Sequence, residues 1–141
     1  MNIFSGEKGL GAALTNPTEL GRRKGMISEK YRIVFEGKTY PDVEAAYHSL
    51  KSEHAGQNDS MMIELIACKF RQHPRLLQEV REKGGAAWLE TCSHITGFQT
   101  PSAARWEGTG LESRFIRNLV AGFKWALSEA PVGQAPQFDL F

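Results

Sequence analysis

The stretch Gly37–Lys51, GKTYPDVEAAYHSLK, contains a turn followed by the start of a helix, and it does most to decide the fold. Asp42 is placed to cap this helix, because its short side chain can accept a hydrogen bond from the first free backbone N–H groups. A helix that begins directly after Asp42 aligns Glu44, Tyr47 and Lys51 on one side, at i, i+3 and i+7. A carboxylate, a phenol and an ammonium beside an apolar stripe suit a pocket wall, although a solvated helix face would show the same spacing.

The residues before this helix predict a β-hairpin. Tyr31–Phe35 is rich in β-forming residues, and Glu36-Gly37 is a suitable turn that leads into Lys38–Tyr40. A second strand is predicted over Ala87–Cys92, and residues 54–59 and 94–105 are predicted as loops.

Helices are predicted over most of the remaining chain. Asn16, Pro17 and Glu19 are typical of a helix start with a capping box, Ser60 is a candidate cap, and Pro74 suits a first helical position. The predicted ranges are 16–25, 43–53, 60–72, 74–84 and 112–129. The fold class that follows is α+β: a single, mostly α-helical domain over residues 1–129 with a small β-hairpin.

The composition is that of one globular domain. The 141 residues are 41% hydrophobic and 23% charged, and 17 basic against 16 acidic side chains give a net charge of +1. This balance excludes a protein that coats nucleic acid. No apolar run approaches the roughly 18 residues of a membrane span, and no secretory signal is visible, so we expect no membrane association.

The cysteines and histidines predict neither a disulfide framework nor a metal site. Cys68 and Cys92 are expected to be buried as small hydrophobic residues, in a protein of the reducing cytoplasm. No metal and no cofactor are expected, because the four histidines show no metal-ligand spacing: His48, His54, His73 and His94.

The last twelve residues, Ala130–Phe141, differ in character from the rest. APVGQAP is typical of a flexible linker. The closing residues are Gln137, Phe138, Asp139, Leu140 and Phe141. This QFDLF resembles the pentapeptide with which bacterial DNA-handling proteins bind the DNA polymerase sliding clamp. Apolar anchors and a glutamine on a tether suit such docking, but the same residues could fold back and complete the core.

Several blocks of the chain together resemble the NADAR superfamily of YbiA-like proteins. Gly37–Lys51 is similar to the signature hairpin and helix of that family, and Gly11–Asn16, GAALTN, to its early G-x-L-S-N segment. Met62–Ser93 looks like the long central run with its Lys-Phe pair, and Arg105–Gly110, RWEGTG, like the tryptophan loop. The resemblance covers residues 11–127 and implies a YbiA-like fold.

The resemblance implies hydrolysis of an N-glycosidic bond, with ADP-ribose or a related ribose phosphate in the pocket. The family activities are removal of ADP-ribose from guanine, including guanine in DNA, and cleavage of phosphoribosylamino-pyrimidine intermediates of riboflavin synthesis. A third possibility is an ADP-ribose-binding module without turnover, because this chain lacks a segment that family members usually carry after the signature helix.

The same resemblance assigns roles to individual residues. Glu44 is the expected catalytic carboxylate, since it can stabilise an oxocarbenium-like state or activate water, and the first turn of a helix stabilises its negative charge. The substrate-binding residues expected around it are Thr15, Asn16, Tyr47, Lys51, Trp106, Glu107, Gly108 and Gly110. Among these, the tryptophan would stack on a ring, and the two glycines would let backbone N–H groups approach a pyrophosphate.

Overall fold

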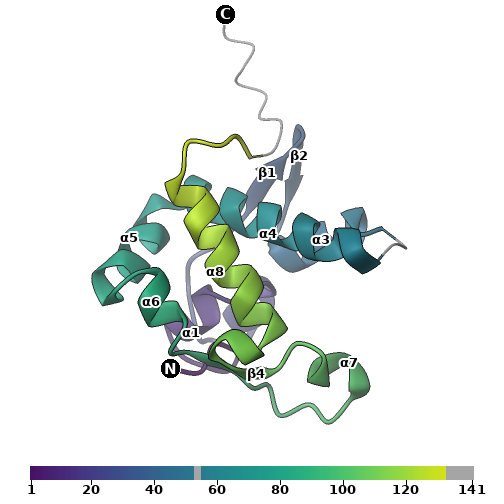
Figure 1. Ribbon diagram of the computed structural model, residues 1–141, viewed down its shortest axis with the longest axis vertical. Coiled ribbons are helices and arrows are strands. Elements are labelled where there is room, and N and C mark those ends of the chain that lie inside the picture. Colours follow the sequence, from purple (N-terminus) through teal and green to yellow (C-terminus); the bar gives the residue numbers. More distant parts are fainter. Residues whose placement is uncertain (53–54, 133–141) are drawn as a thin grey trace, which may run out of the picture.

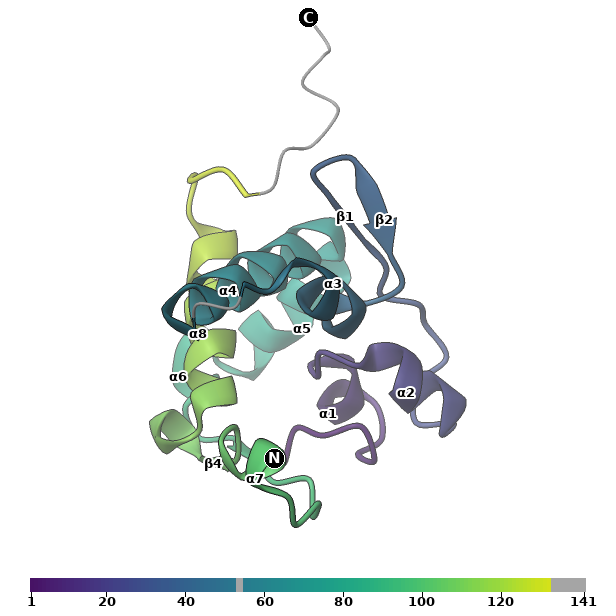
Figure 2. The same ribbon diagram turned by 90° about the vertical axis from the view of Figure 1, so that its right-hand side faces the viewer.

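The computed structural model of the protein describes residues 1–52 and 55–132 (Figure 1). It confirms the predicted α+β class: a small domain, mostly helical, with two short antiparallel sheets. Figure 2 shows the β-hairpin at one end of the molecule and α7 and β4 at the other, with α4 between them. The elements are α1 (Leu10–Ala13), α2 (Thr18–Arg23), β1 (Ile33–Phe35), β2 (Lys38–Tyr40), α3 (Val43–Leu50), α4 (Ala55–Gln72), α5 (Pro74–Lys83), α6 (Ala86–Leu89), β3 (Ser93–His94), α7 (Pro101–Ala104), β4 (Gly108–Thr109), the 3-10 helix η1 (Gly110–Glu112) and α8 (Arg114–Leu127).

The core is centred on the crossing of α4 and α8, the most extensive contact between any two elements. The rings of Phe70 and Phe123 meet edge to face, with centroids 5.4 Å apart. The inner stripe predicted for the last helix is buried: Phe115, Leu119, Phe123 and Ala126. Gly122 lies at the crossing itself, where α8 passes directly over Ile66 of α4.

The hairpin forms as predicted, although β1 begins at Ile33 instead of Tyr31. Ile33 pairs with Tyr40, and the turn residues Glu36 and Gly37 have positive φ angles of 51° and 79°. Positive φ at both central residues gives the turn whose twist matches that of the strands.

The second predicted strand is wrong, because Ala87–Cys92 lies largely in α6 and the turn after it. Leu89 and Cys92 are both buried, and a spacing of three suits a helical turn better than a strand, in which buried side chains alternate. The strand β3 begins later, at Ser93, and pairs with β4 on the far side of the predicted loop. That loop also contains the short helix α7, which is capped by the Thr100 side chain.

A loop was predicted over residues 54–59, and for residues 55–59 this prediction is wrong, since α4 already begins at Ala55 and Ser60 lies inside it. Asp59 explains the extra turn: its Oδ1 accepts hydrogen bonds from Arg114 at 2.8 Å and Asn118 at 3.0 Å, both on α8. This tertiary contact is not visible in the local sequence.

The remaining helix ends differ in smaller ways. α3 ends at Leu50, so that Lys51 follows the helix in an extended conformation. α8 begins at Arg114, capped by the Ser113 side chain, and ends at Leu127. Within the described ranges, no helix has the length and apolar character needed to cross a bilayer. The pentapeptide Gln137–Phe141 lies outside these ranges.

Asp42, not Asn16, caps the helix that follows Pro17. Asp42 Oδ1 accepts from the Ala45 N–H at 2.9 Å at the start of α3, and Oδ2 accepts from the Glu19 N–H at 3.0 Å in the first turn of α2. The predicted capping box is therefore absent, and the Glu19 carboxylate instead pairs with Arg22 at 3.0 Å. One buried carboxylate thus satisfies free N–H groups of two helices.

Candidate functional site

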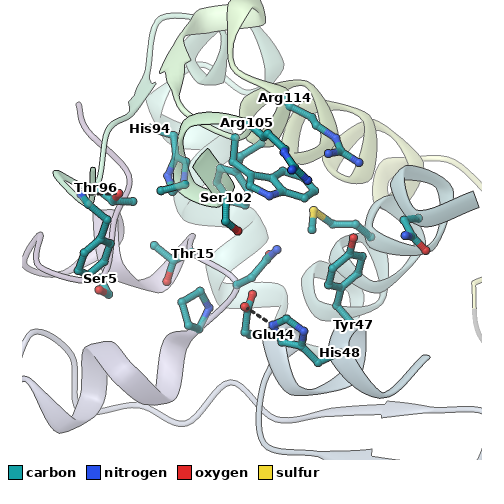
Figure 3. A pocket seen from close by; sticks show the side chains of 18 of the residues that line it. Ser5, Thr15, Glu44, Tyr47, His48, His94, Thr96, Ser102, Arg105 and Arg114 are labelled. Atoms are coloured by element: carbon teal, nitrogen blue, oxygen red, sulfur yellow. Dashed lines mark hydrogen bonds and ion pairs between the residues drawn. The ribbon is translucent and has the colours of Figure 1, made fainter. Parts of the chain in front are cut away.

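A cavity of about 790 Å³ opens between the N-terminal helices, α3 and the segment from His94 to Arg114 (Figure 3). This volume lies within the range of small-molecule sites, roughly 300–1,000 Å³. Its lining residues are Ser5, Thr15, Asn16, Pro17, Leu20, Glu44, Tyr47, His48, Lys51, Ser52, Asn58, Met62, His94, Thr96, Phe98, Thr100, Ser102, Ala103, Arg105, Trp106, Arg114 and Phe115.

Most of the predicted site residues come together in this cavity, although they are far apart in the sequence. Those that line it are Thr15, Asn16, Glu44, Tyr47, Lys51 and Trp106. The Asn16 carbonyl accepts a hydrogen bond from the Glu44 N–H at 3.2 Å, which fixes the segment before α2 against the first turn of α3. The Thr15 hydroxyl donates to the Ala12 carbonyl at 2.6 Å and is buried.

Glu44 supplies the acidic group of the cavity. It is the only carboxylate among the lining residues that the structure describes. Its Oε2 lies 2.8 Å from His48 Nε2, one helical turn further along α3 (Figure 3). The Glu44 side chain is 39% exposed, so it can be reached from the open cavity, and the pair itself contributes little to stability.

Three basic groups stand among the described lining residues, Lys51, Arg105 and Arg114, and Arg114 is the most firmly held. Its Nε donates to Asp59 Oδ1 at 2.8 Å, and its guanidinium carbon lies 3.9 Å from the centre of the Trp106 ring. Burial opposes ionisation of Asp59, but hydrogen bonds from Asn118 and Arg114 outweigh it and lower the pKa of Asp59. The Trp106 ring also contributes a cation–π contact to the Arg114 guanidinium, and its stacking on a ligand ring stays a prediction.

Tyr47 lies beside Trp106 and Arg114 in the cavity wall. Its ring meets that of Trp106 edge to face, with centroids 6.3 Å apart. Burial raises the pKa of its phenol, with Arg114 opposing, so the hydroxyl stays protonated and can donate to a ligand.

Three predicted binding residues lie outside the cavity lining: Glu107, Gly108 and Gly110. Glu107 Oε2 accepts from both the N–H and the hydroxyl of Thr96, each at 2.6 Å, and these bonds lower the pKa of Glu107. The Gly110 N–H donates to the Cys92 carbonyl at 2.8 Å and is not available to a pyrophosphate.

The two glycines have a packing role instead. A Cβ at Gly110 would lie 2.7 Å from the Glu90 carbonyl oxygen, and one at Gly108 would lie 2.9 Å from the Ser113 nitrogen. Both positions also have positive φ. Glycine is needed here because two backbone segments approach closely.

Several cavity residues were missed from the sequence, notably His48, His94, Arg105 and Arg114. His48 could have been found, because it follows Glu44 at i+4 on the same helix face. The other three lie in or beside a segment without clear periodicity, so only the tertiary structure brings them to Glu44. Within residues 1–52 and 55–132, no cluster of three or more His, Cys, Asp or Glu side chains is placed to hold a metal ion.

No protein-family model matches the chain, and no match was found among curated proteins or solved structures. The lining residues that the structure describes combine one carboxylate with three basic side chains, a set that suits an anionic ligand.

Proposed function

We propose that the protein is an N-glycosidase that hydrolyses the N-glycosidic bond of an ADP-ribosyl adduct, most simply ADP-ribosyl-guanine, including guanine in DNA. The observation that carries this proposal is that Glu44, the sole carboxylate of the described cavity lining, shares the cavity with Lys51, Arg105 and Arg114. The resemblance of the sequence to the NADAR superfamily supports the same reaction class.

The residues suit the two parts of such a substrate. Lys51, Arg105 and Arg114 can pair with the diphosphate, and the guanidinium of Arg114 is already oriented by Asp59 and Trp106. The cavity, at about 790 Å³, lies toward the upper end of the usual range, which favours a ligand larger than a single sugar.

The Glu44 carboxylate is suited to the bond-breaking step. The bond between the anomeric carbon and nitrogen breaks through an oxocarbenium-like state, whose positive charge a nearby carboxylate stabilises. The oxygen of a water molecule then bonds to the anomeric carbon, and Glu44 transiently accepts a proton from that water. The electron pair of the broken bond leaves with the base nitrogen, which takes up that proton.

The test is a hydrolysis assay on an oligonucleotide that carries ADP-ribosylated guanine. We expect the wild type to release ADP-ribose and Glu44→Gln to be slower by about 10²–10⁴-fold, the usual contribution of a positioned acid or base. Glu82→Gln makes the same chemical change on an exposed site of α5 and should leave the rate unchanged.

Two outcomes would redirect the proposal. Release of ribose phosphate from a phosphoribosylamino-pyrimidine, but not of ADP-ribose from guanine, would leave the proposed role of Glu44 unchanged. The proposed substrate would then be the pyrimidine intermediate. Tight binding of ADP-ribose without hydrolysis of either substrate would make the protein a binding module.

A further inference from the structure

His94 is fixed in one tautomer by its contact with the N-terminal segment. His94 Nδ1 lies 2.6 Å from the carbonyl oxygen of Ile3. A carbonyl oxygen can only accept, so Nδ1 carries the hydrogen. Burial lowers the pKa of His94, while the Ile3 carbonyl, Glu107 and Glu44 act in the opposite direction. A neutral ring with its hydrogen on Nδ1 has an unprotonated Nε2, which is a hydrogen-bond acceptor.

The ring is also fixed in orientation, and it points into the cavity. It packs on Phe115 of α8 with centroids 4.6 Å apart. Figure 3 shows His94 on the wall that faces Glu44 across the cavity. Among the residues that the structure describes, no hydrogen bond to His94 Nε2 is present.

An acceptor at this place restricts which part of a ligand can bind there. Phosphate oxygens are acceptors too, so they cannot pair with an unprotonated nitrogen; they suit the side chains of Lys51, Arg105 and Arg114 instead. A sugar hydroxyl is a donor. If Glu44 acts at the anomeric carbon, the ribose lies between Glu44 and His94.

We propose that His94 Nε2 accepts a hydrogen bond from a hydroxyl of the ribose whose glycosidic bond is cleaved, which makes His94 a substrate-binding residue specific for the sugar. The inference rests on the proposed function, since it places the ribose beside Glu44.

Two substitutions separate the contributions of the two ring nitrogens of His94. In His94→Asn the side-chain amide nitrogen replaces Nδ1 and keeps the bond to Ile3, but the acceptor at Nε2 is lost. In His94→Gln the side-chain amide oxygen reaches the place of Nε2, whereas the bond to Ile3 is lost. Binding of ADP-ribose and of ADP, which lacks the second ribose, is measured by calorimetry for both variants and the wild type.

We expect His94→Asn to bind ADP-ribose about 3- to 10-fold more weakly, as for the loss of one hydrogen bond, with ADP binding unchanged. His94→Gln should bind ADP-ribose about as well as the wild type. Equal losses for ADP and ADP-ribose, or none in His94→Asn, would overturn the inference and leave the proposed function intact. A wild type that binds neither compound would overturn the proposed function and the inference with it.

A measurement on the wild type avoids any folding defect in the variants. The nitrogen-15 chemical shifts of the His94 ring identify the tautomer directly. We expect an Nδ1–H tautomer whose Nε2 signal moves on addition of ADP-ribose and does not move on addition of ADP. An Nε2–H tautomer in the free protein would overturn the inference.

Discussion

Lys69 on α4 is a lysine whose amine lies inside the protein. Its Nζ donates to the carbonyls of Ala13 at 2.5 Å and Thr15 at 2.8 Å, directly behind the cavity segment that carries Asn16. Burial lowers the pKa of Lys69 to about 7, and the negative charge of Asp42 opposes this shift. A neutral amine has two N–H groups, and both find a carbonyl here.

The pKa of Lys69 predicts that stability rises with pH just above neutrality. An unfolded lysine has a pKa of about 10.4, so between about pH 7 and that value the unfolded chain binds more protons than the folded protein, and the free energy of unfolding increases with pH. Below about pH 7 the folded protein carries the full cost of burying the charged amine. Above that pH the amine loses its proton, and the free energy of unfolding rises by up to about 1.4 kcal/mol per pH unit.

Urea unfolding of the wild type and of Lys69→Met at several pH values from about 7 to about 8.5 measures this effect. This window lies above the range in which His73 and His94, with their lowered pKa values, change charge. The wild type should gain stability relative to the variant as pH rises. Parallel profiles would show that Lys69 is charged in the folded protein throughout.

At the scale of single residues, the sequence predicted part of the candidate site. Glu44 and Tyr47 could be placed together because they share a helix face and therefore a local geometry. His94 and Arg114 could not, since their positions depend on Ile3 and on Asp59, residues that are distant in the chain. The burial of Lys69 could not be predicted either, because its partners Ala13 and Thr15 are also distant in the chain.

At the scale of the elements, Gly122 allows α8 to cross α4 closely. A Cβ at this position would lie 2.5 Å from Ile66 Cγ2 and 3.0 Å from the Ile63 carbonyl oxygen. Helix propensity alone would favour alanine over glycine by about 1 kcal/mol. At this crossing the steric cost outweighs that gain, because one of the two contacts is with backbone.

Gly122→Ala is therefore expected to destabilise the protein by about 1–3 kcal/mol, the usual cost of overpacking. Urea denaturation gives the free energy of unfolding, and Lys124→Ala on the exposed face of α8 is the control, with a change within about 0.5 kcal/mol. If Gly122→Ala were more stable than the wild type, the crossing would be looser than the structure shows.

The hairpin, α5 and the last helix were predictable as elements because their signals are local: a two-residue turn, a proline at the first helical position, and a regular apolar stripe. The strand assigned to residues 87–92 was wrong because a short apolar run fits a helix and a strand equally well. The early start of α4 depends on Asp59 and its partners on α8, which no local signal reveals.

At the scale of the whole molecule, the pentapeptide Gln137–Phe141 predicts an interaction separate from the cavity. If it binds a bacterial sliding clamp, deleting it should abolish clamp binding and leave hydrolysis of an oligonucleotide substrate unchanged, because docking and hydrolysis would then use separate residues. Surface plasmon resonance on immobilised clamp measures the first effect. Unchanged clamp binding, or loss of folding on deletion, would favour the alternative that the segment completes the core.

Asp42 links the opening of the two helices that form one wall of the cavity. Its two carboxylate oxygens hold the N-termini of α2 and α3, and the Glu44 N–H bonds to Asn16 between them. Asp42 is the N-cap residue of α3, so this helix end cannot fray without moving the acceptor that protects the Glu19 N–H of α2. The amide hydrogen of Glu19 should therefore exchange with deuterium at least as fast as that of Ala45, because every opening of α3 also exposes the start of α2.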